Sequence, residues 1–353
     1  MFMKIRQNNV EEGRWNKIHE IIMGASKIVC STHINADGDG IGSQVAFCEL
    51  MKTLDKECRI MNPSPMPEEF DFLNHTTKLE FYNKSNHFDW LKGADLAVIF
   101  DIGDIKRLHE LGDDLHYLKI PILSIDHHPH ADTNSIAYMV HDISVAATGE
   151  LVYDYIKYVY DKLGQPMTLK RTMADGLYVS LLTDTGSFRF SNTSPKAHEI
   201  AGELLHSGVK PYEIYERVYE NNSFEKIFLQ SSAMKTIQCD ETGQLAWFIV
   251  DRKMINDSGA KDEDVSGFTD LVRSIKGVEV AVMFHEISDS TTRANFRSKG
   301  RVSIDSLARE LGGGGHAFAA GVTINLPMCD SIEKVVAETK SVIQKTFAES
   351  SKK

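Results

Sequence analysis

The sequence predicts an α/β protein of two domains, the first built on a mostly parallel sheet. Three short apolar runs, rich in β-branched residues, are typical of buried parallel strands: Lys27–His33, Ala94–Asp101 and Ile120–Asp126. Segments with helical spacing accompany them at Gly42–Leu54 and Thr148–Leu163. This alternation predicts βαβ units with right-handed crossovers. The 353 residues are enough for two domains.

The second half of the chain changes character. The pattern is helical from Ser194 to about Gln238, and two further strands are predicted at Leu245–Asp251 and Val278–His285. Ser303–Leu311 is expected to be a short helix that ends at Gly312. We therefore expect a first domain over 1–205, a helical linker over 206–239 and a smaller second domain over 240–345.

Composition excludes several classes of protein. Apolar residues make up 42% and charged residues 25%, which is typical of a globular chain and not of a disordered, collagen-like or coiled-coil one. The apolar runs are far shorter than the roughly 20 residues that cross a bilayer, and the first residues lack the apolar core of a signal peptide. The net charge of −11 argues against binding long double-stranded nucleic acid. We expect a cytoplasmic protein without a membrane partner.

The five cysteines are scattered and include no CxxC pair. They are Cys30, Cys48, Cys58, Cys239 and Cys329. This usage fits a reducing compartment and argues against a disulfide framework or a zinc–thiolate site. We expect all five to be buried apolar side chains.

Residue types that bind metals recur where the predicted strands end. They are His33 with Asp37 and Asp39, then Asp101, then Asp126, His127 and His128, and finally Asp184. Asp184 follows the apolar stretch Gly176–Thr183, whose spacing fits either a strand or a buried helix. Each Asp alone is most simply a turn or helix-capping residue. A tight glycine turn at Gly38 and Gly40 would bring His33, Asp37 and Asp39 together.

The combined pattern is more specific than its parts. The carboxyl ends of parallel strands meet at one edge of the sheet, so four carboxylates and two imidazoles are expected there together. Four carboxylates balance the charge of two divalent cations. Carboxylate and imidazole ligands suit Mn²⁺, with Mg²⁺, Co²⁺ or Zn²⁺ as alternatives. Two such ions activate a water and stabilise an in-line displacement at phosphorus.

These residues resemble the motifs of a known family. His33-x-Asn-x-Asp37-x-Asp39, Asp101, Asp126-His127-His128 and Asp184 are similar, in order and separation, to the four motifs of the DHH phosphoesterase superfamily. Phe296–Lys299 and the run from Gly312 to Gly321 resemble the DHH-associated second domain. The resemblance covers nearly the whole chain. It implies a mixed-sheet α/β second domain and is nearest to the bacterial nanoRNases that also dephosphorylate 3′-phosphoadenosine-5′-phosphate (pAp).

The resemblance also implies roles for these residues. One cation would be held by His33, Asp37 and Asp101, and the other by Asp39, Asp101, His127 and Asp184. The catalytic residues would be Asp101, which bridges the cations, and His128, which faces the substrate phosphate. Asp126 would brace the histidines.

A second group of candidates lies in the C-terminal domain. Four consecutive glycines let backbone N–H groups approach an anion closely. Arg297 offers a guanidinium fork for phosphate, although its assignment depends mainly on the resemblance. The substrate-binding set that we expect besides His128 is Arg297, Ser298, Gly313, Gly314, Gly315 and His316. Arg293 is a weaker candidate, and Arg107 and Arg189 have either phosphate-binding or ordinary surface roles.

The expected function is hydrolysis of very short 5′-phosphorylated RNA to 5′-mononucleotides, together with dephosphorylation of pAp. A second domain that caps the cleft would limit substrate length. Three alternatives stay open: a phosphodiesterase for linear pApA or cyclic dinucleotides, an inorganic pyrophosphatase, and a catalytically silent nucleotide-binding regulator. The resemblance is also compatible with a homodimer.

Overall fold

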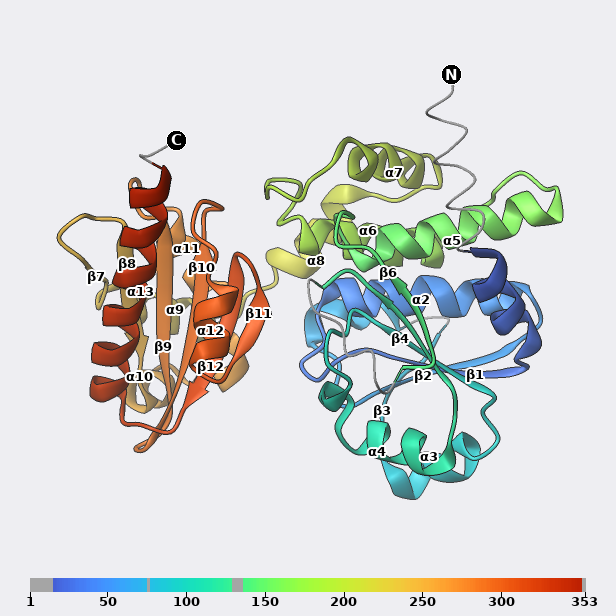
Figure 1. Ribbon diagram of the computed structural model, residues 1–353, viewed down its shortest axis with the longest axis horizontal. Coiled ribbons are helices and arrows are strands. Elements are labelled where there is room, and N and C mark those ends of the chain that lie inside the picture. Colours follow the sequence, from blue (N-terminus) through green and yellow to red (C-terminus); the bar gives the residue numbers. More distant parts are fainter. Residues whose placement is uncertain (1–14, 75–76, 129–135, 351–353) are drawn as a thin grey trace. The chain divides into compact units, whose positions relative to one another are not determined.

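The computed structural model describes residues 15–74, 77–128 and 136–350. The chain forms two compact units that divide between Asn221 and Asn222. Each unit has its own sheet (Figure 1) and its own hydrophobic core. The predicted α/β class is confirmed, with a parallel sheet in the first unit and a mixed sheet in the second.

The first unit contains a six-stranded sheet in which every pair of neighbours is parallel, in the order β3-β2-β1-β4-β5-β6. The strands are β1 (Lys27–Ser31), β2 (Glu57–Asn62), β3 (Leu79–Phe81), β4 (Leu96–Phe100), β5 (Ile122–Asp126) and β6 (Tyr138–His141). The three predicted strands are β1, β4 and β5. The order reverses between β1 and β4, and a sheet of this kind binds ligands beyond the carboxyl ends of the strands at that reversal.

Helices cover both faces of this sheet (Figure 1). They are residues 15–24, α2 (Gly38–Thr53), η1 (Glu68–Leu73), α3 (Lys84–Leu91), η2 (Ile105–Leu108), α4 (His109–Leu118), α5 (Thr148–Leu163), α6 (Arg171–Asp184), α7 (Pro195–His206) and α8 (Pro211–Tyr219). Alternate residues of each strand face opposite ways, so Val98 and Phe100 join the core beneath α2, α5 and α6. Ala97 and Ile99 join the smaller core on the α4 side.

Two helices differ from the sequence-based expectation. The stretch whose type was open, Gly176–Thr183, is helical and belongs to α6. The expected glycine turn is wrong, because Gly38 and Gly40 are the first residues of α2, which begins four residues before the predicted Gly42. The Asp37 side chain caps this helix by accepting hydrogen bonds from the backbone N–H groups of Asp39 and Gly40.

The second unit contains a six-stranded sheet in the order β11-β12-β10-β9-β8-β7. The strands are β7 (Gln238–Cys239), β8 (Leu245–Val250), β9 (Val280–Ser288), β10 (Thr291–Ser298), β11 (Gly314–His316) and β12 (Ala319–Ile324). Among the strands that the structure describes in this sheet, only β8 and β9 pair in parallel. The helices are α9 (Phe224–Met234), α10 (Arg252–Ser258), η3 (Asp262–Val265), α11 (Phe268–Arg273), α12 (Asp305–Glu310) and α13 (Met328–Ser350).

The division between the units falls within the predicted linker. Helix α8 buries Ile214 in the core of the first unit, and α9 buries Leu229 in the second. In the part of the chain that the structure describes, no helix combines the length and the apolar character that a bilayer crossing requires.

The expectation that all five cysteines are buried is wrong for two of them. Cys30, Cys48 and Cys58 are buried, but Cys239 and Cys329 are exposed. Cys239 lies on the two-residue strand β7 at the sheet edge, and Cys329 lies in the first turn of α13. Neither position has a neighbouring element that covers it completely.

Candidate metal centre

The eight candidate residues of the first unit lie at the carboxyl-terminal edge of its sheet. His33 follows β1, Asp101 follows β4, and His127 and His128 follow β5, whose last residue is Asp126. The remaining three come from helices: Asp37 caps α2, Asp39 lies in its first turn, and Asp184 is the last residue of α6. The structure therefore brings together residues that are up to 151 positions apart, since 184 minus 33 is 151.

The first cluster consists of His33, Asp37 and Asp101. His33 Nε2 lies 3.7 Å from Asp37 Oδ2 and 3.5 Å from Asp101 Oδ2. Nδ1 of the same ring lies 2.8 Å from the carbonyl oxygen of Ile34. When Nδ1–H donates to that carbonyl, Nε2 is the nitrogen that can bind a cation.

The second cluster is formed around His127. Its Nε2 lies 3.5 Å from Asp39 Oδ2 and 3.7 Å from Asp184 Oδ2. The same nitrogen lies 3.5 Å from Asp101 Oδ1. The two oxygens of Asp101 thus face different histidines, so this carboxylate stands between the two clusters.

The backbone of Asp101 is held in an unusual conformation. Its φ is +58°, in the left-handed region that residues other than glycine seldom adopt. Its N–H donates to the carbonyl oxygen of Ile125 on the neighbouring strand (3.1 Å), and the Thr148 hydroxyl donates to Oδ1 (3.4 Å). Backbone strain of this kind persists where the surrounding structure enforces it, most often at functional sites.

Asp39 is the most extensively hydrogen-bonded carboxylate of the group. Backbone N–H groups of Thr148 and Gly149, at the start of α5, donate to it at 2.7 and 3.1 Å. The hydroxyls of Ser43 and Ser180 also donate to it. The start of a helix favours negative charge. Even so, burial and the nearby Asp101 carboxylate raise the pKa of Asp39 to about 7.

Asp39 and Asp184 meet because α2 and α6 cross very closely. A Cβ at Gly42 would lie 2.1 Å from the carbonyl oxygen of Gly176, and a Cβ at Gly176 would lie 2.7 Å from that of Gly42. A Cβ at Gly38 would lie 2.5 Å from the Thr183 side chain. Only glycine fits such a contact between helix backbones. The glycines of the aspartate motif therefore serve helix packing and not a turn.

The carboxylates of the two clusters shift the pKa values of the neighbouring histidines upward. Burial alone would lower the pKa of His33, but hydrogen bonding to Asp101 and Asp37 outweighs this and raises it to about 10. The carboxylates likewise raise the pKa of His127 well above its usual value. Burial, with the neighbouring carboxylates, raises the pKa of Asp184.

Divalent cations bound here would balance the charge of the four carboxylates and would displace the histidine protons. The donors are carboxylate oxygens and imidazole nitrogens. These clusters, buried except for the exposed Asp37 and the partly buried Asp184, are therefore consistent with a metal site.

His128 has a different setting from His127. Its Nδ1 donates to Asp126 Oδ1 at 2.7 Å, and Asp126 is completely buried. Its carbonyl oxygen accepts a hydrogen bond from His141. These contacts fix the orientation of the His128 ring beside Asp101, whose Oδ1 lies 3.5 Å from His128 Nδ1.

Sequence reasoning missed several residues that build this site. Thr148, Gly149 and Ser180 bind Asp39, and the Asn192 side chain donates to the carbonyl oxygen of Asp184 at 3.0 Å and to its Oδ2 at 3.3 Å. The predicted helix start at Thr148 was a signal that could have indicated a place for a carboxylate, but the spacing could not show which one would reach it.

Arg107 and Arg189, for which the sequence left a phosphate-binding and a surface role open, both contact this region. Arg107 Nη2 lies 2.8 Å from His33 Nδ1 and donates to it when that nitrogen carries no proton, and Arg189 donates to the carbonyl oxygen of Gly186 just after α6.

In the second unit the structure separates two of the predicted substrate contacts. Arg297 and Ser298 are neighbours on β10 and point to opposite faces of the sheet. Ser298 is buried, and its hydroxyl accepts a hydrogen bond from Gly300 N–H. Arg297 is half-buried and lies 3.7 Å from an Asp270 carboxylate oxygen.

The glycine run forms the edge strand β11 and the turn before it. A Cβ at Gly313 would lie 2.2 Å from the carbonyl oxygen of Gly321, and a Cβ at Gly315 would lie 2.5 Å from that of Ala319. Gly314 has open space at its Cβ position. Position 316 pairs with Ala319, which also pairs with Arg297, so the backbone aligns positions 297, 319 and 316 in one row.

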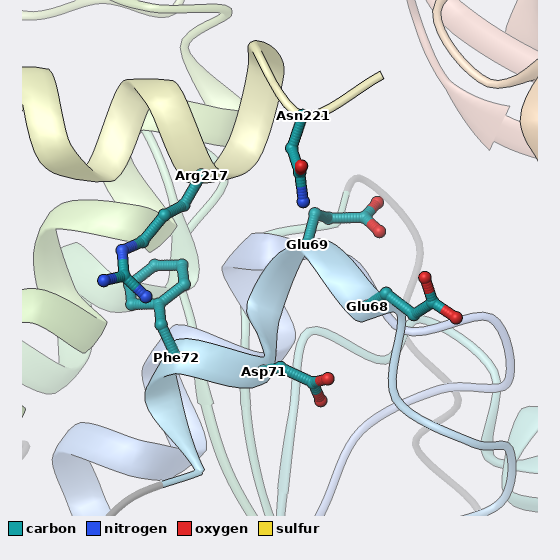
Figure 2. A pocket seen from close by; sticks show the side chains of 6 residues that line it. All are labelled: Glu68, Glu69, Asp71, Phe72, Arg217 and Asn221. Carbon is teal, nitrogen blue, oxygen red and sulfur yellow. The ribbon is translucent and has the colours of Figure 1, made fainter. Parts of the chain in front are cut away.

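A cavity of about 380 Å³ lies elsewhere in the first unit. Figure 2 shows its lining from η1 and the α8 region: Glu68, Glu69, Asp71, Phe72, Arg217 and Asn221. Three carboxylates stand against one guanidinium, which lies 5.4 Å from the centre of the Phe72 ring. That excess of negative charge makes the cavity unsuitable for a phosphorylated ligand.

Comparisons with known proteins agree with this geometry. Residues 27–181 match the DHH family N-terminal domain, and residues 245–345 match the DHHA1 domain. The chain is 31% identical to the bifunctional oligoribonuclease and PAP phosphatase NrnA of Thermus thermophilus, over 93% of this chain and 95% of that protein. It is 27% identical to the Bacillus subtilis protein of the same name, over 89% and 94% of the two chains.

A solved structure shares the fold. It is that of an exopolyphosphatase-related protein from Bacteroides fragilis, with a TM-score of 0.83 and 23% identity over 94% of this chain and 96% of that one. The family resemblance inferred from the motifs is thereby confirmed: the chain belongs to the DHH/DHHA1 phosphoesterase family and is related to NrnA.

Proposed function

We propose that this phosphoesterase hydrolyses very short 5′-phosphorylated RNA to 5′-mononucleotides and removes the 3′-phosphate of pAp. The observation that carries the proposal is the position of Asp101, whose two oxygens face the separate clusters around His33 and His127. The Thermus and Bacillus relatives, named for these two activities, support the choice of substrates.

In this proposal His33, Asp37 and Asp101 hold one divalent cation, and Asp39, Asp101, His127 and Asp184 hold another. Mn²⁺ is the expected ion, with Mg²⁺ or Co²⁺ as alternatives. Two bound cations would supply an activated water and charge stabilisation at phosphorus.

The protein's own groups position the substrate. Asp126 accepts a hydrogen bond from Nδ1–H of His128. This bond fixes the orientation in which His128 contacts the phosphoryl group. Asp101 aligns the two cation sites with each other. In the second unit we assign substrate binding to Arg297 and to the backbone of Gly313–His316, with Ser298 supporting the turn that follows β10.

A turnover panel with Mn²⁺ in one buffer tests the proposal. The substrates are a 5′-phosphorylated RNA dinucleotide, a longer RNA, pAp, cyclic di-AMP and pyrophosphate. We expect rapid release of mononucleotides from the dinucleotide, cleavage of pAp and poor turnover of the long RNA. Turnover of pyrophosphate alone would contradict the assigned substrates. A preference for cyclic di-AMP, or no turnover with metal bound, would also contradict them.

A further inference from the structure

The face of β10 and β12 that points away from α12 and α13 carries a surface that the proposed contacts use only at Arg297. Alternate residues of the two strands, Thr292 and Val322 among them, are buried under α12 and α13. The residues between them face away from that core. We call this surface the β10–β12 strip; its members are Arg293, Asn295, Arg297, Ala319, Gly321 and Thr323.

Two side chains of the strip form a connected pair over a glycine. Arg293 Nε donates to Asn295 Oδ1 at 3.2 Å. Gly321 pairs with Asn295, and a Cβ at Gly321 would lie 3.0 Å from Asn295 Oδ1 and 3.7 Å from Arg293 Nη2. The pair therefore lies across Gly321. On its other side, Gly321 is the register partner of Gly314 on β11. The two positions beside Arg293 and Asn295 therefore carry no side chains.

The charge of the strip is incompletely balanced. Arg297 has Asp270 within 3.7 Å, whereas Arg293 is exposed and makes no ion pair with a carboxylate among the described residues. Its Nη2 lies close to Gly321, 3.7 Å from the position that a Cβ would take there. An isolated exposed arginine is usually just solvated, but here the side-chain oxygen of Asn295 accepts a hydrogen bond from Nε and so orients the guanidinium plane. An oriented guanidinium is suited to binding a phosphate.

We propose that the β10–β12 strip binds a second nucleotide unit of a short single-stranded oligoribonucleotide, with Arg293 holding its phosphate and Asn295 positioning Arg293. This inference rests on the proposed function. Arg293 and Arg297 are four positions apart, which is about 13 Å along an antiparallel strand. That length accommodates about two nucleotides, whereas the phosphates of pAp are one nucleoside apart. The strip thus distinguishes oligonucleotides from mononucleotides.

Equilibrium binding tests the inference without turnover. The probe is a 5′-phosphorylated RNA trinucleotide with phosphorothioate linkages, which resist hydrolysis, in the presence of Mn²⁺; AMP is the one-nucleotide comparison. Arg293→Gln should weaken trinucleotide binding about 10-fold and leave AMP binding unchanged. Because one phosphate contact is lost, the slope of log K against log salt should decrease by about 0.7.

Matched variants separate charge from geometry. Arg309→Gln removes an equal charge from α12, where Arg309 pairs with Asp305, and should leave both affinities unchanged. Arg293→Lys should keep the salt slope but bind the trinucleotide more weakly, because lysine has no Nε–H for Asn295. Asn295→Ala should also weaken trinucleotide binding at unchanged slope.

Equal losses for trinucleotide and AMP, or an unchanged trinucleotide affinity and slope in Arg293→Gln, would overturn the inference. So would wild-type protein that binds the trinucleotide no better than AMP. If the wild type binds the trinucleotide through Arg293 but hydrolyses neither short RNA nor pAp, the proposed function fails while the strip remains a binding site.

Discussion

The carboxylate clusters of the first unit are largely buried, whereas every residue of the β10–β12 strip in the second unit is partly or fully exposed. In the first unit, neighbouring elements hold each ligand: Asp39 alone accepts hydrogen bonds from two helix-terminal N–H groups and two hydroxyls. In the second unit, Arg293 is held by a single side-chain hydrogen bond. Chemistry at phosphorus requires fixed ligands, while recognition of a flexible single strand tolerates a surface that adapts.

Both regions depend on glycine, but for different contacts. Gly42 and Gly176 let two helix backbones touch, and this contact brings Asp39 to Asp184. Gly313 and Gly315 let the edge strand β11 approach β12. A substitution at the first pair should therefore damage the metal centre, and a substitution in the second unit should affect substrate binding alone.

Removal of divalent cations should have the largest effect and should be confined to the first unit. We expect chelation with EDTA to abolish turnover and Mn²⁺ to restore it. Because the four carboxylates then repel each other, hydrogen exchange of α2 and α5 should accelerate while exchange of β9 and β10 stays unchanged. Equal acceleration in both units would contradict the separation of the two regions.

The substitution Asp101→Asn should have the second-largest effect on turnover. It removes the charge that both clusters share, so turnover of the RNA dinucleotide should fall by about 10³-fold or more, with loss of bound metal measured by elemental analysis. Asp104→Asn is the matched control, because Asp104 is exposed and only caps η2. Normal turnover in Asp101→Asn would exclude a bridging role.

Gly42→Ala should destabilise the first unit by about 3 kcal/mol, since its Cβ would collide with the Gly176 carbonyl oxygen. Urea unfolding monitored by circular dichroism measures this change. Gly202→Ala in α7 is the control: nothing lies within 4 Å of its Cβ, so it should stabilise the protein by about 0.5–1 kcal/mol. Similar effects of the two substitutions would refute the role of the helix crossing.

Arg297→Gln should have the smallest effect on chemistry. We expect KM for short RNA to rise about 10-fold, as for loss of one hydrogen bond to a charged group. Turnover of a nonspecific aryl phosphate ester should stay unchanged, because that substrate needs only the metal centre. Equal losses on both substrates would assign Arg297 to the structure of the second unit.

Much of this architecture follows from local patterns in the sequence. The β-branched runs predicted β1, β4 and β5, because a strand buried on both faces must be apolar at every position. The same runs predicted that His33, Asp101 and His127 share one edge of the sheet. The helix over Thr148–Leu163 has the predicted limits. Family motifs added the candidate residues of the second unit.

Other features depend on contacts between segments far apart in the chain. The strand order that reverses between β1 and β4, the helical state of Gly176–Thr183 and the left-handed backbone of Asp101 depend on packing against distant elements. The same holds for the partners of Asp39, which come from α5 and α6. Which of Arg297 and Ser298 faces the core is determined by the packing of β10, and this packing buries Ser298.

By itself, then, the sequence determined the fold class, the strand ends and the residue types that meet there, because hydrophobic periodicity and residue chemistry are local properties. Only the tertiary structure decided that the motif glycines join two helices, that one carboxylate stands between two clusters, and that Arg293 and Asn295 form a pair over Gly321. These are distances between residues remote in sequence, and the folded core alone determines them.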